Sequence, residues 1–303
     1  MLIANPIYDI VFKYLLEDLD IARELLSTIL GEEIITLEVK PQETASENAE
    51  KNLNIFRFDF KAHIKIESGE QKNILIELQK AKQAFDVMRF RKYLGENYRK
   101  ADDIINEIGI MEKRPLPIVT IYFLGFPLDN IHNAVIKINR EYKDAITQEI
   151  IEKKEEFVEL LTHDTFLIQI LSLGHQTGTK LERVLQVFSP EYQTNDRHQL
   201  DFTGDVEDKL VKKMVTRLGR AITDENIRNV MDAEDEIERT FAREIGKKDK
   251  IIAEKDKIIA ENEKIIAENE KELETERQKA ETEKQKNEEL IRQIQELQKK
   301  LNP

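Results

Sequence analysis

The chain has 303 residues, a formal net charge of −13 and no cysteine. The lack of cysteine excludes disulfides, thiolate nucleophiles and cysteine-bound zinc. The five histidines form no His-x-x-x-His pair, so we expect any bound metal to be held by oxygen ligands, which favours magnesium or manganese. The negative charge argues against a surface that coats DNA over a long stretch, but it is compatible with contact at one groove.

The apolar runs of the sequence are short. None approaches the roughly 20 residues that a membrane-spanning helix needs, and the first residues lack the basic and apolar pattern of a signal peptide. We therefore expect a cytoplasmic protein that does not contact a membrane. We also expect no small-molecule cofactor.

The first third of the chain changes its apolar period. Residues 7 to 30 carry apolar side chains at three- and four-residue spacing, which predicts a helix that begins after Asn5-Pro6 and ends at Gly31. Between residues 58 and 66 the period becomes two, which predicts a strand with one buried face. Residues 73 to 79 predict a second, apolar strand, and the turn residues at 67–70 would join the two as a hairpin.

The rest of the chain predicts an α/β protein with three parts. A helix is expected from about 81 to 108, and the almost continuous apolar run from 118 to 126 is typical of a buried strand. Residues 130 to 245 have the pattern of helices. We therefore predict an α/β domain at 1–128, a helical region at 129–245 and a separate heptad-repeat helix at 246–303.

The C-terminal segment repeats every seven residues. One heptad position is occupied by Ile252, Ile259, Ile266, Leu273, Ala280, Asn287, Ile294 and Leu301. The partner position becomes apolar only at Leu290 and Leu297, so the pattern of a coiled coil is good only from residue 287 to 301. The single Asn287 favours a parallel homodimer. A solvated single helix without a partner is the alternative.

Three polar residues interrupt the predicted hairpin. Asp59 lies in the middle of the first strand, and Glu77 and Gln79 share one face of the second. The turn would place Asp59 opposite residues 77 to 79, about 5 Å from its cross-strand neighbour, where two carboxylates could chelate one divalent cation. Lys61 shares the face of Asp59, so a surface ladder of salt bridges is the alternative. Glu77 fits that alternative less well, because its strand is apolar on both faces.

The helix predicted after the hairpin is basic. Residues 80 to 100 include seven lysines and arginines against two acidic residues, a local charge of +5. This pattern suggests phosphate contacts through Arg89, Arg91 and Lys92. An ordinary solvated helix face, with Phe85, Met88 and Leu94 packed inward, is the alternative.

These segments resemble, in chain order, the PD-(D/E)XK nuclease family transposases, which are related to the recombination-promoting nucleases. The resemblance covers roughly residues 5 to 125. It implies a restriction-endonuclease-like core made of a helix, a mixed β-sheet and a crossover helix. The segments that carry it are Asn5–Asp9 with Phe12-Lys13, Phe58–Ala62, Ile76–Lys80 and Met88–Leu94.

The resemblance also implies roles for particular residues. Asp59 and Glu77 would bind Mg²⁺ or Mn²⁺, and Gln79 would occupy the third position of an E-x-Q element. Asp9 matches an acid of the first helix that joins the site, and an interaction of Asp9 with the helix dipole is an equally open alternative. Many nucleases of this fold have lysine where Gln79 stands. Glutamine can hold a water but brings no charge, which bears on the rate and on whether the chain is active, and Lys61 is the nearest substitute.

Three hypotheses follow. The first is a Mg²⁺-dependent DNA endonuclease that hydrolyses phosphodiester bonds, in recombination or transposition of a mobile element. The second is a nuclease fold of low or lost activity that acts as a DNA- or protein-binding scaffold, assembled through the heptad segment. The third is a helical structural protein whose acids are incidental. It would be favoured if Asp59 and Glu77 were more than about 8 Å apart or on opposite faces.

Overall fold

The computed structural model describes residues 1–40, 57–66, 71–81, 87–105, 110–174 and 178–301. The chain divides into two compact units, Met1–Asp235 and Glu236–Pro303. The first unit is an α/β structure built on a six-stranded mixed sheet. The second consists of the distal part of one long helix. The predicted α/β class is confirmed.

The sheet combines antiparallel and parallel pairing. Its strand order is β2-β3-β4-β7-β9-β8, in which β4, β7 and β9 run parallel and the other neighbours are antiparallel. Two small ladders, β1–β10 and β5–β6, lie outside it. The strands are β1 (Leu2–Ala4), β2 (Glu33–Val39), β3 (Arg57–Lys65), β4 (Gln71–Ala81), β5 (Asp102–Ile105), β6 (Met111–Arg114), β7 (Ile118–Leu124), β8 (Val135–Ile138), β9 (His163–Gln169) and β10 (Gln199–Asp201).

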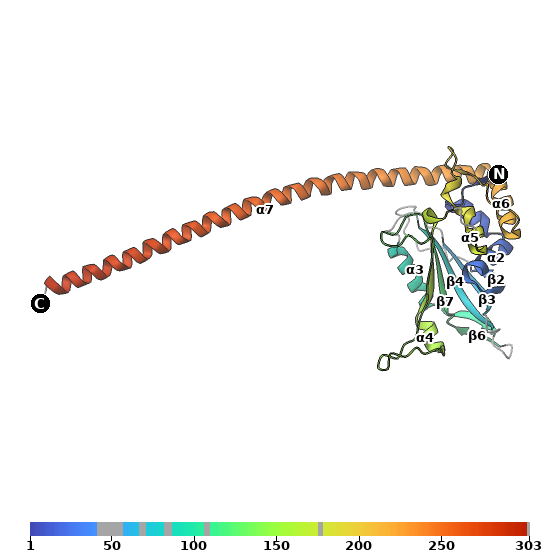
Figure 1. The fold of residues 1–303 in the computed structure, drawn as a ribbon, viewed down its shortest axis with the longest axis horizontal. Helices are drawn as coiled ribbons and strands as arrows, with labels where there is room; N and C mark the ends of the chain where they lie inside the picture. Colours follow the sequence, from blue (N-terminus) through green and yellow to red (C-terminus); the bar gives the residue numbers. More distant parts are fainter. Residues whose placement is uncertain (41–56, 67–70, 82–86, 106–109, 175–177, 302–303) are drawn as a thin grey trace. The chain divides into compact units, whose positions relative to one another are not determined.

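Helices cover both faces of the sheet. Figure 1 shows α2, α5 and α6 on one side of the strands and α3 on the other. In the described residues the helices are α1 (Asp9–Leu16), α2 (Leu19–Leu30), α3 (Val87–Arg99), α4 (Glu156–Leu161), α5 (Lys180–Leu185), α6 (Lys209–Ala221) and α7 (Glu225–Leu301), with 3-10 turns at Ile170–Ser172, Gln186–Phe188 and Pro190–Tyr192. Within the same residues no helix is both long and apolar enough to cross a membrane.

The helix predicted at 7–30 is two helices. The side chain of Asp18 accepts hydrogen bonds from the backbone N–H groups of Asp20 and Ile21, which begins α2. Such caps satisfy donors that the first helical turn leaves open. The predicted end at Gly31 is confirmed, because this residue adopts a φ of 75°, a conformation that glycine reaches without strain.

The predicted hairpin is confirmed as β3 and β4, which pair antiparallel. Residues 67–70, where we predicted the turn, lie outside the described residues. The strand predicted at 118–126 is confirmed as β7. The helix predicted at 81–108 is shorter. It is described from Val87 to Arg99, and Asp102–Ile105 then pairs with β6 instead of continuing the helix.

The prediction of a separate helical region at 129–245 is wrong. This segment contributes β8 and β9 to the sheet, and the first unit extends to Asp235. Phe166 and Ile168 of β9 pack into the same core as Phe123 of β7. A strand of seven residues is too short for its apolar pattern to distinguish it from a helical segment, so pairing with β7 decided its conformation.

The C-terminal helix begins earlier than the heptads indicate, since α7 starts at Glu225 rather than at residue 246. Its first turns, up to Asp235, belong to the first unit. The carboxylate of Glu234 accepts the backbone N–H groups of Asp9 and Ile10 at 2.9 and 3.0 Å. Asp235 is buried and accepts the hydroxyl of Tyr8 at 2.9 Å. Glu234 therefore caps α1 from a point more than 200 residues along the chain.

Candidate functional site

Asp59 and Glu77 are direct partners in the β3–β4 ladder. Their neighbours Phe60 and Ile76 belong to the core under α1 and α2. Side chains alternate along a strand, so Asp59 and Glu77 belong to the opposite face, the one that α3 covers. Asp59 is buried. The side chain of Glu77 lies outside the described residues, and its place follows from the backbone register. This same-face pairing does not meet the condition that would favour the third hypothesis.

Gln79 stands two residues beyond Glu77 on the same face of β4. Its side chain is completely buried, and its register partners are Arg57 on β3 and Tyr122 on β7. The β3–β4 hairpin therefore places Asp59, Glu77 and Gln79 on one face of the sheet, as the sequence pattern predicts.

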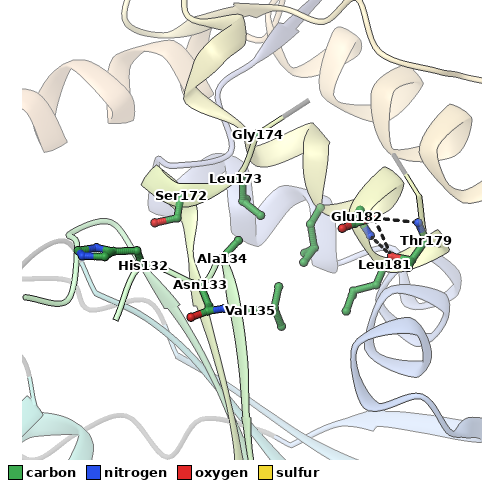
Figure 2. Close-up of a pocket in the computed structure, with 11 residues that line it drawn as sticks. His132, Asn133, Ala134, Val135, Ser172, Leu173, Gly174, Thr179, Leu181 and Glu182 are labelled. Atoms are coloured by element: carbon green, nitrogen blue, oxygen red, sulfur yellow. Dashed lines mark hydrogen bonds between the residues drawn. The ribbon is translucent and has the colours of Figure 1, made fainter. Parts of the chain in front are cut away.

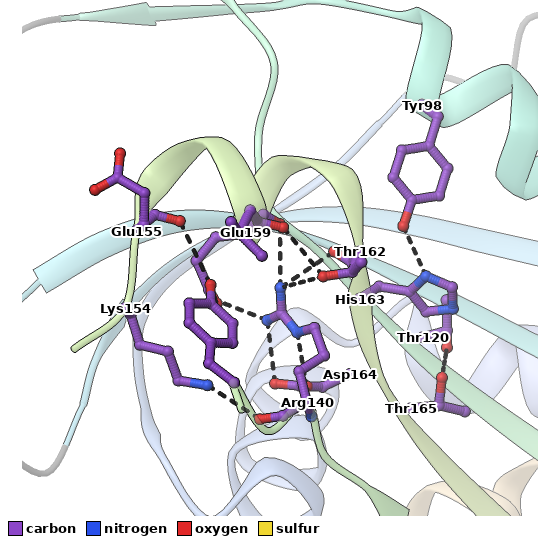
Figure 3. Close-up of polar contacts among 12 residues, drawn as sticks. Tyr98, Thr120, Arg140, Lys154, Glu155, Glu159, Thr162, His163, Asp164 and Thr165 are labelled. Carbon is purple, nitrogen blue, oxygen red and sulfur yellow. Dashed lines mark hydrogen bonds and ion pairs between the residues drawn. The ribbon is translucent and has the colours of Figure 1, made fainter. Parts of the chain in front are cut away.

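The polar residues continue across the sheet beyond the hairpin. In the parallel ladders Glu77 pairs with Thr120 of β7, and Thr120 pairs with Thr165 of β9. The two threonine hydroxyl oxygens are buried and 2.8 Å apart. Figure 3 shows the two side chains directed at each other. We call Asp59, Glu77, Thr120 and Thr165 the polar row. Neither threonine was predicted from the sequence. Thr120 could have been noticed, because it is a polar exception in an otherwise apolar strand.

Lys80 points away from this row. Its ammonium group forms an ion pair with Asp9 at 2.7 Å, and the lysine and aspartate side chains are 1% and 20% exposed. Lys80 also donates to the backbone oxygen of Ile7 and lies 5.7 Å from the centre of the Phe12 ring. The structure thus places the carboxylate of Asp9 at the opposite face of β4 from Asp59 and Glu77. Asp9 stands in the first turn of α1, as the helix-dipole alternative expects.

Lys61 lies on the same face of β3 as Asp59. Its ammonium group donates to the backbone oxygen of Asp103 at 2.6 Å, which places that charge beside β5. The lysine that the sequence analysis proposed as a substitute therefore comes from the correct face, but it is bound to the β5–β6 ladder.

Helix α3 covers the polar face with an apolar stripe. Phe90 stacks on Tyr122 with ring centres 5.0 Å apart, and Leu94 and Tyr98 pack against Leu75 and Ile118. Inward packing is thus confirmed for Leu94, whereas Phe85 and the side chain of Met88 lie outside the described part of the chain. On the outer side of α3 the side chains of Arg91 and Lys92 are exposed. The side chain of Arg89, proposed with them for phosphate contact, is also outside the description.

An ionic network holds the start of β9. Arg140 donates from Nε to Asp164 at 2.9 Å and from an Nη to Glu159 at 2.9 Å (Figure 3). Burial alone would raise the pKa of Asp164, but hydrogen bonds from the side chain and backbone of Arg140 outweigh it and hold that pKa below its usual value. Arg140 thereby ties β8, α4 and β9 together.

His163 connects the same strand end to α3. Its Nδ1 lies 2.7 Å from the hydroxyl of Tyr98, and the residue is partly buried. Burial lowers the pKa of His163, and the nearby positive charge of Arg140 lowers it further. The ring is therefore neutral near pH 7, and Tyr98 can donate its proton to Nδ1.

We expect the stability of the protein to fall as the pH drops below about 6.5, the usual pKa of histidine. In that range the unfolded chain binds a proton at His163 while the folded chain does not, so unfolding gains free energy from protonation. The urea midpoint at pH 5.5 and at pH 7.5 measures this loss. His163→Asn, which does not titrate, should show a smaller difference between the two pH values, and an unchanged difference would contradict the assignment.

The oxygen donors of Asp59, Glu77 and Gln79 suit a hard cation. Asp59, Glu77 and the amide oxygen of Gln79 supply oxygen only, and Mg²⁺ is typically bound by one or two carboxylates together with waters and substrate phosphates. Among the described side chains no group of three or more histidines, aspartates or glutamates could hold a metal ion. The ligands proposed from the sequence remain the carboxylates of Asp59 and Glu77, with the amide of Gln79 beside them.

A pocket of about 500 Å³ lies elsewhere, between β8 and α5. Figure 2 shows His132, Val135, Leu173 and Glu182 among the residues around it. The carboxylate of Glu182 already accepts the backbone N–H and the hydroxyl of Thr179, at 2.8 and 3.2 Å. Among the described residues that line this pocket, Glu182 is thus already engaged, and we assign the pocket no acid–base or metal chemistry.

Comparison with known proteins gives no match: no family model, no curated protein and no solved structure is similar to this chain.

Proposed function

We propose that the protein is a Mg²⁺-dependent DNA endonuclease that hydrolyses phosphodiester bonds, with Mn²⁺ as an alternative cofactor. The direct pairing of Asp59 with Glu77 on one face of the sheet is the observation that supports this most strongly. Two neighbouring carboxylates on one face can chelate a divalent cation, and the charge of the ion would offset the cost of burying theirs. On this proposal the sheet with α1 and α3 is a restriction-endonuclease-like core.

Each residue of the site would have a separate role. Asp59 and Glu77 would hold the ion, which polarises the scissile phosphate and lowers the pKa of a bound water. Gln79 would accept a hydrogen bond from the attacking water and orient it. Arg91 and Lys92, exposed on α3, would bind the flanking phosphates, with Arg89 beside them in the sequence. Lys61 would assist if it left the backbone oxygen of Asp103.

Incubation of the purified protein with supercoiled plasmid tests this proposal. Nicking in Mg²⁺ or Mn²⁺, with none in EDTA, is the expected result, and a linear product at longer times would indicate cleavage of both strands. A folded protein that leaves the plasmid intact with both ions would overturn the proposal. A role in recombination or transposition of a mobile element rests on the sequence resemblance alone.

A second function, a DNA- or protein-binding scaffold, is favoured by one observation. Lys80 and Lys61, which are close in sequence to the candidate ligands, are both engaged, Lys80 with Asp9 and Lys61 with the backbone of Asp103. The third position of the E-x-Q element holds the uncharged Gln79 in place of a lysine. Retarded migration of DNA without metal-dependent cleavage would favour the scaffold.

We further propose that the second unit forms a parallel homodimer. Its large apolar side chains are about half exposed, among them Leu290, Ile294 and Leu297 at 54, 53 and 59%. From residue 287 to 301 both heptad positions of the seam follow a period of seven, which favours supercoiling with another helix. A copy of the same segment offers the matching a and d positions, and Asn287 pairs with itself only in a parallel, in-register dimer.

Analytical ultracentrifugation should therefore report about twice the chain mass of 35.5 kDa. Leu290→Lys with Leu297→Lys places like charges in the seam and should give a monomer, because facing lysines at d positions repel each other and lose apolar burial. Gln295→Lys, on the outer face of the heptad, is the matched control and should remain dimeric. A wild-type chain that sediments as a monomer at micromolar concentration would contradict the proposal.

A further inference from the structure

The segment between β8 and β9, residues 139–162, carries large apolar side chains that face the solvent. The exposed fractions are 92% for Ile146, 62% for Ile150, 67% for Phe157 and 61% for Leu161. Figure 1 shows α4 and the loop that precedes it at one end of the sheet. We call residues 139–162 the apolar arm. Scattered apolar residues are ordinary on a surface, whereas a continuous apolar face marks an interaction site.

Hydrogen bonds order the arm without a partner. The carboxylate of Asp144 accepts two backbone N–H groups of the tip at 2.7 and 2.8 Å. Below the tip, Lys143 and Ile150 pair as an antiparallel bridge. Tyr142 donates its hydroxyl to Glu159 of α4 at 2.8 Å, which ties the loop to the helix. A partner would therefore meet an ordered surface, and little ordering would be needed on binding.

Helix α4 presents Phe157 and Leu161 on one face, because residues four apart are neighbours on a helix. Glu159 is two residues from each, which is more than half a turn away. Its carboxylate is directed inward to Arg140 at 2.9 Å (Figure 3). The two apolar side chains consequently point away from the domain. A pair of large side chains at this spacing forms a ridge of the kind that packs into the groove of a second helix.

The charge of the arm indicates which partner fits. The arm contains seven acidic and four basic residues, so its formal charge is 4 − 7 = −3. Two of the four bases are directed inward, since Arg140 pairs with Glu159 and Lys154 lies 4.5 Å from the centre of the Tyr142 ring. The exposed acids are Glu141, Glu149, Glu152, Glu155 and Glu156. The arm thus combines exposed apolar side chains with exposed carboxylates.

This combination disfavours several occupants. Nucleic acid and anionic membranes carry negative charge, which the glutamates repel. The arm of a second copy would bring the same acids, and facing like charges oppose association. The basic helices α3 and α6 of a second copy also do not fit, because they pack their apolar sides inside their own domain, through Leu94 in α3 and Leu210 in α6.

We propose that the apolar arm docks a basic amphipathic helix of another protein, with Phe157 and Leu161 as the apolar anchors. The apolar side of that helix would pack on the ridge of α4, and its lysines or arginines would meet the exposed glutamates. Amphipathic helices are commonly recognised in this way, through a few anchors on one face. The arm is separate from the acid pair of β3 and β4, so this inference does not depend on the proposed nuclease activity.

Two labelled peptides test the proposal. Each has about five helical turns with leucines at three- and four-residue spacing, and the remaining positions are lysine in one peptide and glutamate in the other. Fluorescence anisotropy with the full-length protein at physiological ionic strength measures each Kd. We expect the lysine peptide to bind in the micromolar range and the glutamate peptide to bind at least about 10-fold more weakly, because its charge matches that of the arm.

Variants of the arm locate the binding. Phe157→Ser with Leu161→Ser should weaken the lysine peptide by about 10-fold or more, since a few apolar anchors carry most of the affinity of an interface. Glu152→Lys keeps both anchors and should weaken it by about threefold. Leu19→Ser is the matched control, because Leu19 is 43% exposed on α2, and it should leave the Kd unchanged. Unfolding midpoints verify that each variant is folded.

The other outcomes would overturn the proposal. A wild-type chain that does not bind the lysine peptide would do so directly. Equal binding by the wild type and the Phe157→Ser, Leu161→Ser variant would mean that the peptide meets acids elsewhere on the chain. Loss of plasmid retention in that variant would assign the arm to DNA, and a lower sedimenting mass would assign it to a second copy. Failure to nick plasmid would refute the nuclease and leave the docking surface standing.

Discussion

Asp59→Asn is expected to reduce Mg²⁺-dependent plasmid nicking by about 1,000-fold or more. Asparagine keeps the size of the buried side chain and removes its charge. A bound metal ion contributes several kcal/mol of stabilisation to the developing charge of the transition state, and each 1.36 kcal/mol is a factor of ten in rate. Initial rates from the fraction of nicked plasmid, over a range of Mg²⁺ concentrations, measure the loss.

Glu77→Gln should show a loss of the same order, because Glu77 is the register partner of Asp59. The matched control is Glu38→Gln. Glu38 is exposed and pairs with Lys61, so it stands on the same face one strand further out, and its removal should change the rate less than threefold. Equal activity of Asp59→Asn and the wild type, with both proteins folded, would show that the acid pair is not a metal site.

Asp9→Ala is expected to lower the free energy of unfolding by about 3 kcal/mol, the low end of the range for breaking a buried ion pair. The lost partner leaves the Lys80 ammonium group, which is 1% exposed, without the carboxylate that compensates its burial. We expect the low end of that range of free energies because the Asp9 side chain is 20% exposed, so water screens part of its interaction with Lys80. Domain stabilities are only about 5–15 kcal/mol, so urea unfolding will show the shift clearly.

Two further variants test the physical reason. Lys80→Met in the Asp9→Ala background removes the buried charge and should recover most of the stability. Asp20→Ala removes an exposed acid 3.5 Å from Arg23 and should cost less than about 1 kcal/mol. A loss in Asp9→Ala no larger than that in Asp20→Ala would contradict the argument.

The same variant distinguishes the two interpretations of Asp9. If Asp9 only balances Lys80 and begins α1, Asp9→Ala will be less stable but will need the same Mg²⁺ concentration for nicking as the wild type. A large rise in that concentration, at a temperature where the variant is folded, would mean that Asp9 joins the metal site despite its ion pair on the other face of β4.

The hairpin shows what local sequence can determine. Alternation from Phe58 to Ile66 and the interruption of an apolar strand by Glu77 and Gln79 were enough to predict two strands with the acids on one face. The reason is that the side-chain period of a strand is two, so a buried face determines which residues lie opposite each other. Gly31 was predictable for a similar local reason, since one conformation at one residue ends α2.

Neither the full sheet nor its polar row was predictable in this way. Residues 163–169 carry too few apolar positions to distinguish a strand from a helix, and they form β9 because β7 supplies the hydrogen-bonding partner. Thr165 lies in the polar row only because β9 pairs with β7. Intrinsic strand preference is weak compared with the effect of neighbouring strands, so the pairing had to come from the folded chain.

The sequence by itself determined the chemistry available to this protein: oxygen ligands without cysteine, an acid on each strand of a hairpin, a basic helix after it and a seven-residue repeat at the end. Only the tertiary structure decided which of these groups meet. It paired Lys80 with Asp9 on one face of the sheet and set Thr120 beside Glu77 on the other. The two pairs join residues that are 71 and 43 positions apart in the sequence. Such long-range contacts depend on how strands and helices pack, and no local sequence pattern encodes them.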